Sequence, residues 1–408
     1  MRILVIGSGG REDAIAWKLQ QNPRVEEIII KSSSLSIEEL LKIAKEEKID
    51  FTMVGSEELL VKGIVDAFEK ENLKIFGPNK QAAMLEGSKA FSKDFMKKYG
   101  VKTAKYENFK NAEEAFAYIE KQDYPLVVKA SGLAAGKGVI ICQNLEEAKK
   151  AVQEIMVDKV FQDAGAEVVI EEFLEGVEAS ILSITDSKVI LPFISAKDHK
   201  KIGEKETGLN TGGMGVIAPN PYVTEKVSEA FQKDILEPTL RGMKEEGMKF
   251  AGIIFFGLMI TKKGVYLLEY NMRMGDPETQ AVLPLLESDF LEMLEDALEG
   301  NLDANKIKWS KDSSCCVVLA SGGYPVSYQK GYEIHGLDKV ENHIFFAGVK
   351  KENRKYYNNG GRVLNIVATG ENLETAIEKA YRDIEKVSFQ DSCYRKDIGT
   401  LYFPIIEI

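Results

Sequence analysis

Short apolar segments alternate with longer amphipathic ones over the first hundred residues, and this pattern limits the fold more than any other feature of the chain. The apolar segments that predict strands are residues 2–6, 27–31, 51–54 and 74–76. Strands separated by helical segments form parallel sheets that carry helices on their faces. We therefore expect an α/β fold whose first domain, residues 1–100, is a doubly wound parallel sheet. Such sheets bind ligands at the carboxyl ends of their strands, which here are residues 7–11 and 55–57.

Composition and charge exclude several classes of partner. A net charge of −11 leaves no electrostatic footprint for a nucleic acid. No apolar run approaches the roughly 18 residues of a membrane span, and the first residues lack the pattern of a signal peptide. The four cysteines show no Cys-x-x-Cys spacing, which is typical of buried thiols in a reducing compartment. We therefore expect a cytoplasmic protein with neither a nucleic-acid nor a membrane partner.

The turn after the first predicted strand contains Gly7, Gly9, Gly10 and Arg11. A dinucleotide-binding loop would need a third glycine where this chain has Glu12, and an acidic residue at the end of the second strand, which is lysine. Both absences argue against a nicotinamide cofactor. The turn can still place backbone N–H groups and a guanidinium against a phosphate at a helix N-terminus.

A small-residue loop at 132–138 follows a predicted strand that ends near Lys129. It is not a Walker A loop, because its spacing differs and Gly138 stands where a Ser or Thr would bind magnesium. A loop of this kind between two strands can fold over a triphosphate and donate backbone N–H groups to it. A flexible hairpin with no ligand is the structural alternative.

Two polar segments indicate a function only when their positions are considered. The segment 171–178 by itself is typical of a solvated strand end, but next to the small-residue loop it could offer backbone groups to adenine. Glu269, Asn271 and Arg273 share one face of a predicted strand, by the period-two rule. Two oxygen ligands and a cation suit Mg²⁺ that bridges phosphate oxygens. A structural ion-pair cluster is the alternative for this triplet.

Taken together, the motifs resemble the phosphoribosylamine–glycine ligase family of the ATP-grasp class, whose members are also called glycinamide ribonucleotide synthetases. The motifs are Gly-Gly-Arg-Glu at 9–12, Leu-Glu-Gly-Ser-Lys-Ala-Phe at 85–91, Lys129 with 132–138, 171–178, Asn-Thr-Gly-Gly-Met-Gly at 210–215 and 269–278. The resemblance also covers Ser-Gly-Gly-Tyr-Pro at 321–325 and Asn-Gly-Gly-Arg at 359–362. It therefore runs nearly end to end.

This resemblance implies a reaction and a division into domains. ATP would activate glycine as glycyl phosphate, and 5-phosphoribosylamine would displace the phosphate to give glycinamide ribonucleotide in de novo purine biosynthesis. The ATP-grasp domain would occupy residues 101–308, with a nucleotide lid at about 124–188, and a small α+β domain would occupy 309–408. A polar segment at 197–215, longer than connections usually run, would be functional. We expect a monomer or a small homo-oligomer.

The resemblance also implies the residues of each subsite. The cofactors would be ATP and Mg²⁺ or Mn²⁺, with Glu269 and Asn271 as metal ligands and Arg273 and Lys137 as catalytic residues. The residues implied for ATP are Lys89, Lys129, Gly132, Ala134, Ala135, Gly136, Gly138, Glu171, Phe173, Leu174 and Glu178. The residues implied for the substrates are Gly9, Gly10, Arg11, Asp198, Gly212, Gly213, Arg273, Asp276 and Glu278.

The chain departs from the family pattern in two places. Asp13 stands in a histidine position, and the segment after Lys31 is short. A carboxylate near the proposed phosphate site should weaken the affinity for phosphoribosylamine. Two other functions stay open at this point: an ATP-grasp ligase for formate or bicarbonate, which would differ at 197–215, and a catalytically silent nucleotide-binding regulator.

Overall fold

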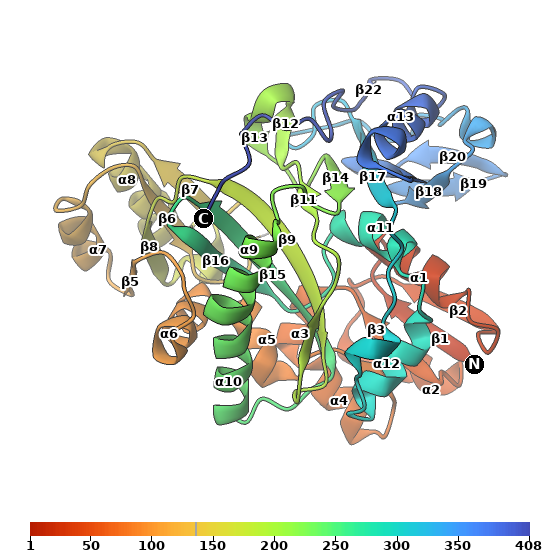
Figure 1. The fold of residues 1–408 in the computed structure, drawn as a ribbon, viewed down its shortest axis with the longest axis horizontal. Helices are drawn as coiled ribbons and strands as arrows, with labels where there is room; N and C mark the ends of the chain where they lie inside the picture. Colours follow the sequence, from red (N-terminus) through yellow and green to blue (C-terminus); the bar gives the residue numbers. More distant parts are fainter. Residues whose placement is uncertain (135–136) are drawn as a thin grey trace.

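The computed structural model describes residues 1–134 and 137–408. The N-terminal sheet has the order β2-β1-β3-β4 with all strands parallel, which confirms the predicted doubly wound α/β class (Figure 1). Its strands are β1 (Arg2–Ile6), β2 (Glu27–Lys31), β3 (Phe51–Val54) and β4 (Ile75–Phe76). The chain leaves β1 toward one edge and later returns to the other side of β1, so the loops after β1 and β3 diverge. A ligand-binding crevice is expected at such a point.

Six helices belong to this part of the chain. They are α1 (Gly10–Leu19), α2 (Ile37–Glu46), α3 (Glu57–Lys62), α4 (Ile64–Lys70), α5 (Lys80–Gly87) and α6 (Lys89–Tyr99). α3 and α4 form two helices rather than one because Gly63 has φ +90°, a left-handed conformation that ends α3. Ser88 then caps α6 by accepting a hydrogen bond from the Phe91 N–H.

An antiparallel sheet of order β10-β9-β15-β16 occupies the middle of the molecule. Its strands are β9 (Val177–Thr185), β10 (Ile190–Pro192), β15 (Gly252–Thr261) and β16 (Gly264–Asn271). On one face Ile254 and Phe256 pack in a core with residues of α6, α9 (Glu225–Phe231) and α10 (Glu237–Glu245). On the other face Ile253 and Phe255 share a core with the N-terminal sheet. The sheet is therefore buried on both sides.

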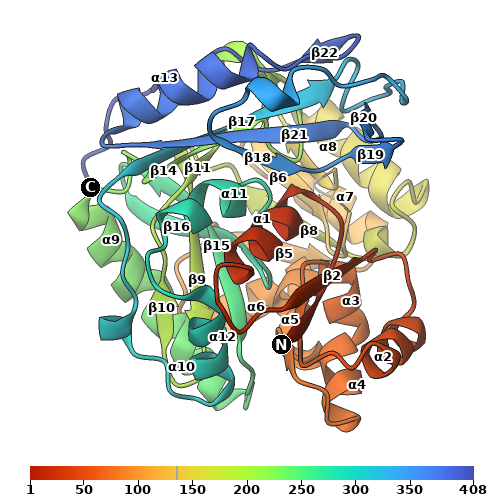
Figure 2. The ribbon, with the colours of Figure 1, turned by 90° about the vertical axis from the view of Figure 1, so that its right-hand side faces the viewer.

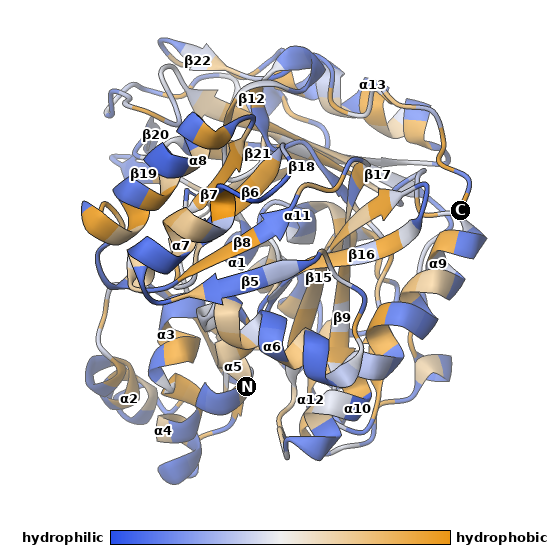
Figure 3. Cartoon of the chain, turned by 90° about the vertical axis from the view of Figure 1, so that its left-hand side faces the viewer, coloured by the Kyte–Doolittle hydropathy of each residue, from blue (hydrophilic) through white to orange (hydrophobic). Residues whose placement is uncertain are grey.

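The sheet that contains most of the predicted nucleotide lid is a separate small layer. It has the order β5-β8-β6-β7, with β5 (Tyr106–Phe109), β6 (Leu126–Ala130), β7 (Val139–Cys142) and β8 (Val168–Glu172). The helices α7 (Ala112–Ile119) and α8 (Leu145–Val152) share a core with it, and Figure 3 shows them beside its apolar strands. The limits of this sheet, 106 and 172, differ from the expected lid limits of 124 and 188.

The C-terminal sheet takes strands from two distant parts of the chain. Its order is β11-β14-β17-β21-β18, with β22 (Ser392–Cys393) beside β17. The five strands are β11 (Lys197–Asp198), β14 (Gly215–Ala218), β17 (Ser313–Ser321), β18 (His343–Phe346) and β21 (Arg362–Gly370). The helix α13 (Leu373–Ile384) packs against it (Figure 2). The polar segment 197–215 is therefore not a plain loop: it supplies β11 and the first residue of β14, and it forms a hairpin of β12 (Lys201–Gly203) and β13 (Thr207–Asn210).

These parts meet around α11 (Glu278–Val282), which contacts α1, β14, β17 and β21. The helix α12 (Phe290–Leu298) follows and packs in the core below the N-terminal sheet. Across the described ranges, no helix has the length and apolar character needed to cross a membrane.

Candidate functional site

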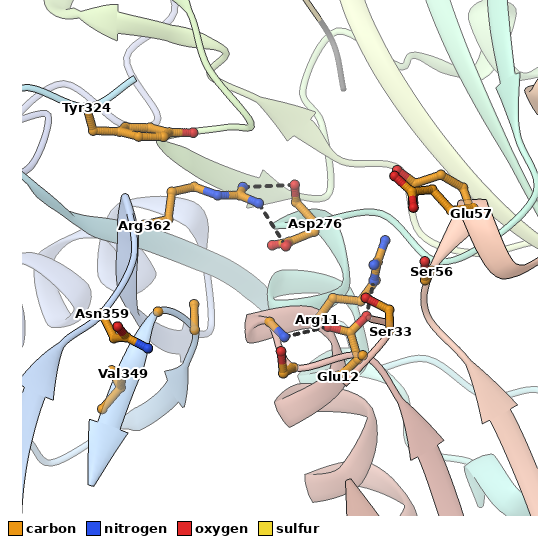
Figure 4. A pocket seen from close by; sticks show the side chains of 16 residues that line it. Arg11, Glu12, Ser33, Ser56, Glu57, Asp276, Tyr324, Val349, Asn359 and Arg362 are labelled. Carbon is orange, nitrogen blue, oxygen red and sulfur yellow. Dashed lines mark hydrogen bonds and ion pairs between the residues drawn. The ribbon is translucent and has the colours of Figure 1, made fainter. Parts of the chain in front are cut away.

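A polar pocket of about 560 Å³ lies where the N-terminal sheet, the central domain and the C-terminal domain meet (Figure 4). The loops after β1 and β3, Asp276 and the loops around 347–349 and 359–362 form its walls. Gly9, Arg11 and Asp276, three of the predicted substrate residues, line it. The predicted crevice at the strand ends is thus present. Glu57, at the second predicted strand end, also lines it, together with Ser33, Tyr324, Asn359 and Arg362, which were not assigned to a site.

A buried carboxylate organises the first loop of the pocket. Glu12 is 2% exposed and accepts a hydrogen bond from the Gly9 N–H at 2.7 Å, as the capping residue of α1. Arg11 Nε donates to Glu12 Oε1 at 2.6 Å, and Arg11 Nη1 donates to the Met274 carbonyl at 3.1 Å. A Cβ at Gly55 would collide with the same carboxylate. The Gly9 N–H is therefore occupied by Glu12, while the guanidinium remains at the pocket wall.

Gly10 has a different reason to be glycine. A Cβ there would collide with Asn365 of β21 and would come within 2.7 Å of Gln280 of α11. Gly10 does not appear in the wall of the polar pocket as far as the described residues define it. Its small size permits the close approach of α1 to the C-terminal sheet.

Arg362 joins the C-terminal domain to the pocket. Its Nη2 lies 2.8 Å from Asp276 Oδ2, and its Nη1 donates to the carbonyls of Gly212 at 2.6 Å and Asp276 at 3.0 Å. The Gly212 N–H donates to the hydroxyl of Tyr324 at 2.9 Å. Burial opposes ionisation of Asp276, but the guanidiniums of Arg362 and Arg11 outweigh it and hold the pKa of Asp276 below its usual value. Two C-terminal side chains thus fix the predicted substrate loop at 212–213.

Arg273 lies between the predicted metal ligands and the pocket. Its Nη2 donates to Asn271 Oδ1 at 3.3 Å, so the structure brings these two predicted residues together. Its Nε lies 3.3 Å from Oε2 of Glu57, which lines the pocket, and its Nη2 lies 3.0 Å from Glu86 Oε1. Glu86 Oε2 also accepts the Met272 N–H at 2.6 Å. Glu57 lies at the strand end 55–57 where a ligand was expected and Glu86 lies in the motif at 85–91, but neither was assigned a contact with Arg273, because they come from α3 and α5, about two hundred residues away.

The predicted ATP lysines converge on the edge of the lid. Lys129 Nζ lies 2.9 Å from Glu171 Oε2, and Lys89 Nζ donates to the Gly132 carbonyl at 3.4 Å. Burial is the main cause that lowers the pKa of Lys89. Lys93, one helical turn after Lys89, also pairs with Glu171 and was missed. The i, i+4 spacing of the two lysines in α6 was the signal that could have found it.

The remaining lid residues lie around the same edge. Gly138 accepts the Ala130 N–H at 2.8 Å, and a Cβ on Gly138 would come within 2.7 Å of the Ala134 Cβ. Lys137 is exposed, and Phe173, in the connection from β8 to β9 with Leu174, is 37% exposed. Ala135 and Gly136 lie outside the described residues.

Glu269 is an ionised carboxylate surrounded by cations. Burial opposes its ionisation, but Lys200, Lys89 and Lys129 outweigh it and lower its pKa. Lys200 was missed; its Nζ lies 2.7 Å from Oε2 of Glu178, the residue predicted for ribose. In residues 1–134 and 137–408, no group of three or more His, Cys, Asp and Glu side chains is arranged to hold a metal ion. Glu269 and Asn271 nevertheless supply two hard oxygen donors, which fit Mg²⁺ when phosphate oxygens complete its ligands.

Asp198 and Glu278 form an acidic niche beside Gly213. Asp198 Oδ1 is buried without a hydrogen-bond partner in the described part of the chain, and burial together with Glu278 raises the pKa of Asp198. Glu278 Oε1 accepts a hydrogen bond from Ser180 at 3.1 Å. Gly213 has φ +115°, and a Cβ there would come within 2.7 Å of Asp198 Oδ1. Within the described residues, Asp198 Oδ1 is therefore an unsatisfied acceptor that suits an ammonium group.

Asp13 points away from the polar pocket. Its Oδ2 accepts the Phe346 N–H of β18 at 2.8 Å, and the side chain lines a separate cavity of about 400 Å³ between α1, β2 and β18. Burial raises its pKa. The expected weakening of phosphoribosylamine affinity assumed a carboxylate near the phosphate, whereas α1 directs the Asp13 side chain toward the C-terminal sheet.

Three family models cover most of the chain. The N domain of phosphoribosylglycinamide synthetase matches residues 1–86, its ATP-grasp (A) domain matches 87–279 and its C domain matches 314–401. The chain belongs to the phosphoribosylglycinamide synthetase family. The resemblance inferred from the motifs is thereby confirmed, and the dinucleotide-binding alternative is set aside.

Individual relatives agree with this membership. A phosphoribosylamine–glycine ligase of Fusobacterium nucleatum is 61% identical, with 99% of this chain and 100% of the relative covered. One of Clostridium acetobutylicum is 55% identical, with 98% and 99% covered. The crystal structure of the phosphoribosylamine–glycine ligase of Thermotoga maritima matches with a TM-score of 0.87 at 34% identity, covering 98% of this chain and 100% of that one. The biotin carboxylase domain of Hydrogenobacter thermophilus 2-oxoglutarate carboxylase, at 18% identity, covers 96% and 91% with a TM-score of 0.74 and shares the fold.

Proposed function

We propose that this chain ligates glycine to 5-phosphoribosylamine with ATP, giving glycinamide ribonucleotide, ADP and phosphate in purine biosynthesis. The observation that carries the proposal is the position of Arg273. It contacts Asn271 on the side of the predicted metal site and Glu57 on the side of the polar pocket. One guanidinium thus lies where an activated carboxylate and an incoming amine would have to meet.

The family's ATP-grasp domain implies that ATP is used with a divalent cation. In our proposal Lys89 and Lys129 neutralise phosphates of ATP, and the loop residues Gly132, Ala134, Ala135, Gly136, Lys137 and Gly138 cover the nucleotide. Phe173 and Leu174 contact adenine, and Glu178 contacts ribose. Closure of the loop would exclude water from a reactive acyl phosphate. Glu171, paired with Lys129, sets the orientation of that lysine.

Glu269 and Asn271 hold the divalent cation, Mg²⁺ or Mn²⁺, in this proposal. The cation supplies charge neutralisation on the phosphate oxygens. The ionised state of Glu269 and the three lysines around it support an anionic ligand shared between them.

Glycine is held with its ammonium group in the niche of Asp198 and Glu278, next to the backbone of 212–213. One carboxylate oxygen of glycine attacks the γ-phosphorus of ATP, and ADP leaves. The amine of phosphoribosylamine then attacks the carbonyl carbon of glycyl phosphate, and inorganic phosphate leaves with the bonding electrons. Arg273 stabilises the charge on the phosphoryl oxygens, so catalysis consists mainly of positioning and electrostatics.

The ribose phosphate of the second substrate occupies the polar pocket. Arg11 offers a guanidinium to the phosphate, which suits a dianion. Gly9 has no side chain, so the ligand can approach its backbone closely. Its N–H is held by Glu12. Asp276, fixed by Arg362, faces the same space.

The division of labour follows the sequence. Residues 1–100 supply the side of the ribose phosphate and, through Lys89, one contact to ATP; 101–308 supply the rest of the ATP-grasp chemistry; and 309–408 supply Tyr324 and Arg362, which hold the substrate loop at 212–213. We further propose that the protein acts in the cytoplasm as a monomer or a small homo-oligomer.

The test is direct. The protein is incubated with ATP, Mg²⁺, glycine and freshly made phosphoribosylamine, and the products are identified by mass. Glycinamide ribonucleotide should form only when all components are present. Parallel reactions replace glycine with formate or bicarbonate; a product in those and none with glycine would assign a different ligase, and no product in any would favour a silent nucleotide-binding protein.

A further inference from the structure

Lys93 is a buried lysine that none of the subsites described above uses. It lies in α6 one turn after Lys89 and is 2% exposed. Its Nζ lies 3.1 Å from Glu171 Oε1 and donates to Thr103 Oγ1 at 2.6 Å. Burial of an ammonium group is strongly unfavourable unless it is paired. The pairing with Glu171 is therefore the feature to explain.

Glu171 is shared by two lysines. Lys129 Nζ approaches Oε2 at 2.9 Å while Lys93 Nζ approaches Oε1 at 3.1 Å, and Glu171 is itself 3% exposed. Burial opposes ionisation of this carboxylate, yet the two ammonium groups outweigh it and lower the pKa of Glu171. Each oxygen of a buried, ionised carboxylate thus has its own cation.

The two lysines differ in their freedom to leave Glu171. Lys129 is the lysine that would neutralise phosphate in the proposed function, so a triphosphate draws its Nζ away from the carboxylate. Lys93 is fixed, because Thr103 Oγ1 accepts a hydrogen bond from its Nζ and in turn donates to the Leu267 carbonyl of β16 at 2.6 Å. With Lys93 absent, nucleotide binding would leave a buried carboxylate without a partner.

We propose that Lys93 is a positioning residue that keeps Glu171 paired while Lys129 turns to the phosphates of ATP. The inference rests on the proposed function, in which Lys129 binds the nucleotide. Lys93 belongs to α6, whereas Glu171 lies on β8 of the lid sheet, so the pair also anchors the lid at its junction with the central domain. Lys93 touches no substrate and acts through Glu171.

The protonation state of Lys93 makes the affinity for ATP depend on pH. Burial is its largest influence and lowers its pKa to about 8, although Glu171 opposes this. The other groups that face it are Lys129, Glu269 and the ring of Tyr106, whose centroid lies 5.8 Å from Nζ. The protonated fraction of Lys93 therefore falls as the pH rises through about 8, and the affinity for ATP should fall with it.

The first test compares Lys93→Met with Lys97→Met. Lys97 is a matched control, because it lies in the same helix and contacts the ring of the same Tyr106 at 5.8 Å but is exposed. Lys93→Met should raise the KM for ATP roughly 10- to 100-fold and leave the KM for glycine and for phosphoribosylamine within about twofold. Lys97→Met should change none of them. An unchanged KM for ATP, or an equal rise for all three substrates, would overturn the proposal.

The second test separates a role through Glu171 from direct contact with ATP. In a Glu171→Gln background the buried carboxylate that needs Lys93 as its counter-ion is gone, so adding Lys93→Met should raise the KM for ATP by no more than about twofold. The same factor in both backgrounds would show that Lys93 acts independently of Glu171, against the proposal. A wild-type protein without ligase activity would instead refute the proposed function.

The pH profile of the wild type keeps the inference testable if a variant does not fold. The KM for ATP should rise between about pH 7 and pH 9.5, as Lys93 loses its proton. In Lys93→Met this rise should be absent. A flat wild-type profile over that range would contradict the proposal.

Discussion

Replacing Arg362 with methionine removes the guanidinium that ties the C-terminal domain to the substrate loop. Methionine keeps most of the unbranched stem, so the loss reports the charge and its hydrogen bonds. The wild-type group pairs with Asp276 at 2.8 Å and donates to the carbonyls of Asp276 and Gly212, and its side chain is 18% exposed. Breaking a buried pair costs about 3–5 kcal/mol, and partial exposure reduces this to roughly 2–3 kcal/mol here. Since about 1.4 kcal/mol is tenfold, kcat/KM should fall roughly 30- to 150-fold.

The decrease in kcat/KM of Arg362→Met should differ from one substrate to another. Arg362 holds Gly212 and lines the polar pocket, so kcat/KM for glycine and for phosphoribosylamine should both decrease. The KM for ATP should stay within about twofold, because Arg362 contacts none of the predicted nucleotide residues in the described chain. Steady-state kinetics with each substrate varied in turn measures this. Arg354→Met, in the exposed turn between β19 (Val349–Glu352) and β20 (Lys355–Asn358), is the control. If both variants behaved alike, or if ATP were affected most, Arg362 would have no role in substrate binding.

Two further predictions concern single carboxylates. Glu269→Ala should lower magnesium-dependent turnover by roughly three orders of magnitude with the fold intact by circular dichroism, and near-normal activity with normal magnesium dependence would show that Glu269 is not a metal ligand. Asp13→Asn keeps an oxygen acceptor for the Phe346 N–H, so the KM for phosphoribosylamine should not change. Burial raises the pKa of Asp13 in the folded protein above its value in the unfolded chain. The stability that Asp13 contributes is therefore present at low pH and is lost as the pH rises above the pKa of the unfolded chain, about 4. The unfolding free energy of Asp13→Asn relative to wild type should increase from about pH 4 upward, and a constant difference would contradict this sign.

The sequence predicted the N-terminal sheet well, because its strands are short, apolar and separated by regular helices. Predicted strands 27–31 and 51–54 coincide with β2 and β3. The helical segment expected between the third and fourth predicted strands is two helices, α3 and α4, because Gly63 adopts a left-handed conformation that composition alone does not reveal. The hairpin of β12 and β13 was missed for a different reason. Its second strand is fully exposed, so no alternation of apolar and polar residues marks it.

The candidate site was predicted only where its residues are close in sequence. Asn271 and Arg273 share a strand end, and the structure brings their side chains together. Glu57, Glu86 and Arg362 reach the same region from other elements, and spacing along the chain carries no signal for such contacts. Arg362 lies within a motif that was noted in the sequence, yet only the fold connects it to Asp276.

Asp13 shows that nearness along the chain does not place a side chain in a site. It lies two positions after Arg11, and the two side chains leave α1 in directions that serve different neighbours. Arg11 donates to Met274 at the pocket, whereas Asp13 accepts from Phe346 of β18. The N–H that Asp13 satisfies belongs to a strand more than three hundred residues away. Only the packing of the C-terminal sheet on α1 decides its orientation.

The central claim is that the carboxylate of glycine is phosphorylated before the amine attacks. Glycine carrying ¹⁸O in both carboxylate oxygens tests it directly, with the inorganic phosphate and the glycinamide ribonucleotide analysed by mass. The account predicts that one ¹⁸O atom passes to phosphate and one remains in the amide carbonyl of the product. Phosphate without label, while labelled product forms, would contradict the acyl phosphate and with it the role assigned to Arg273.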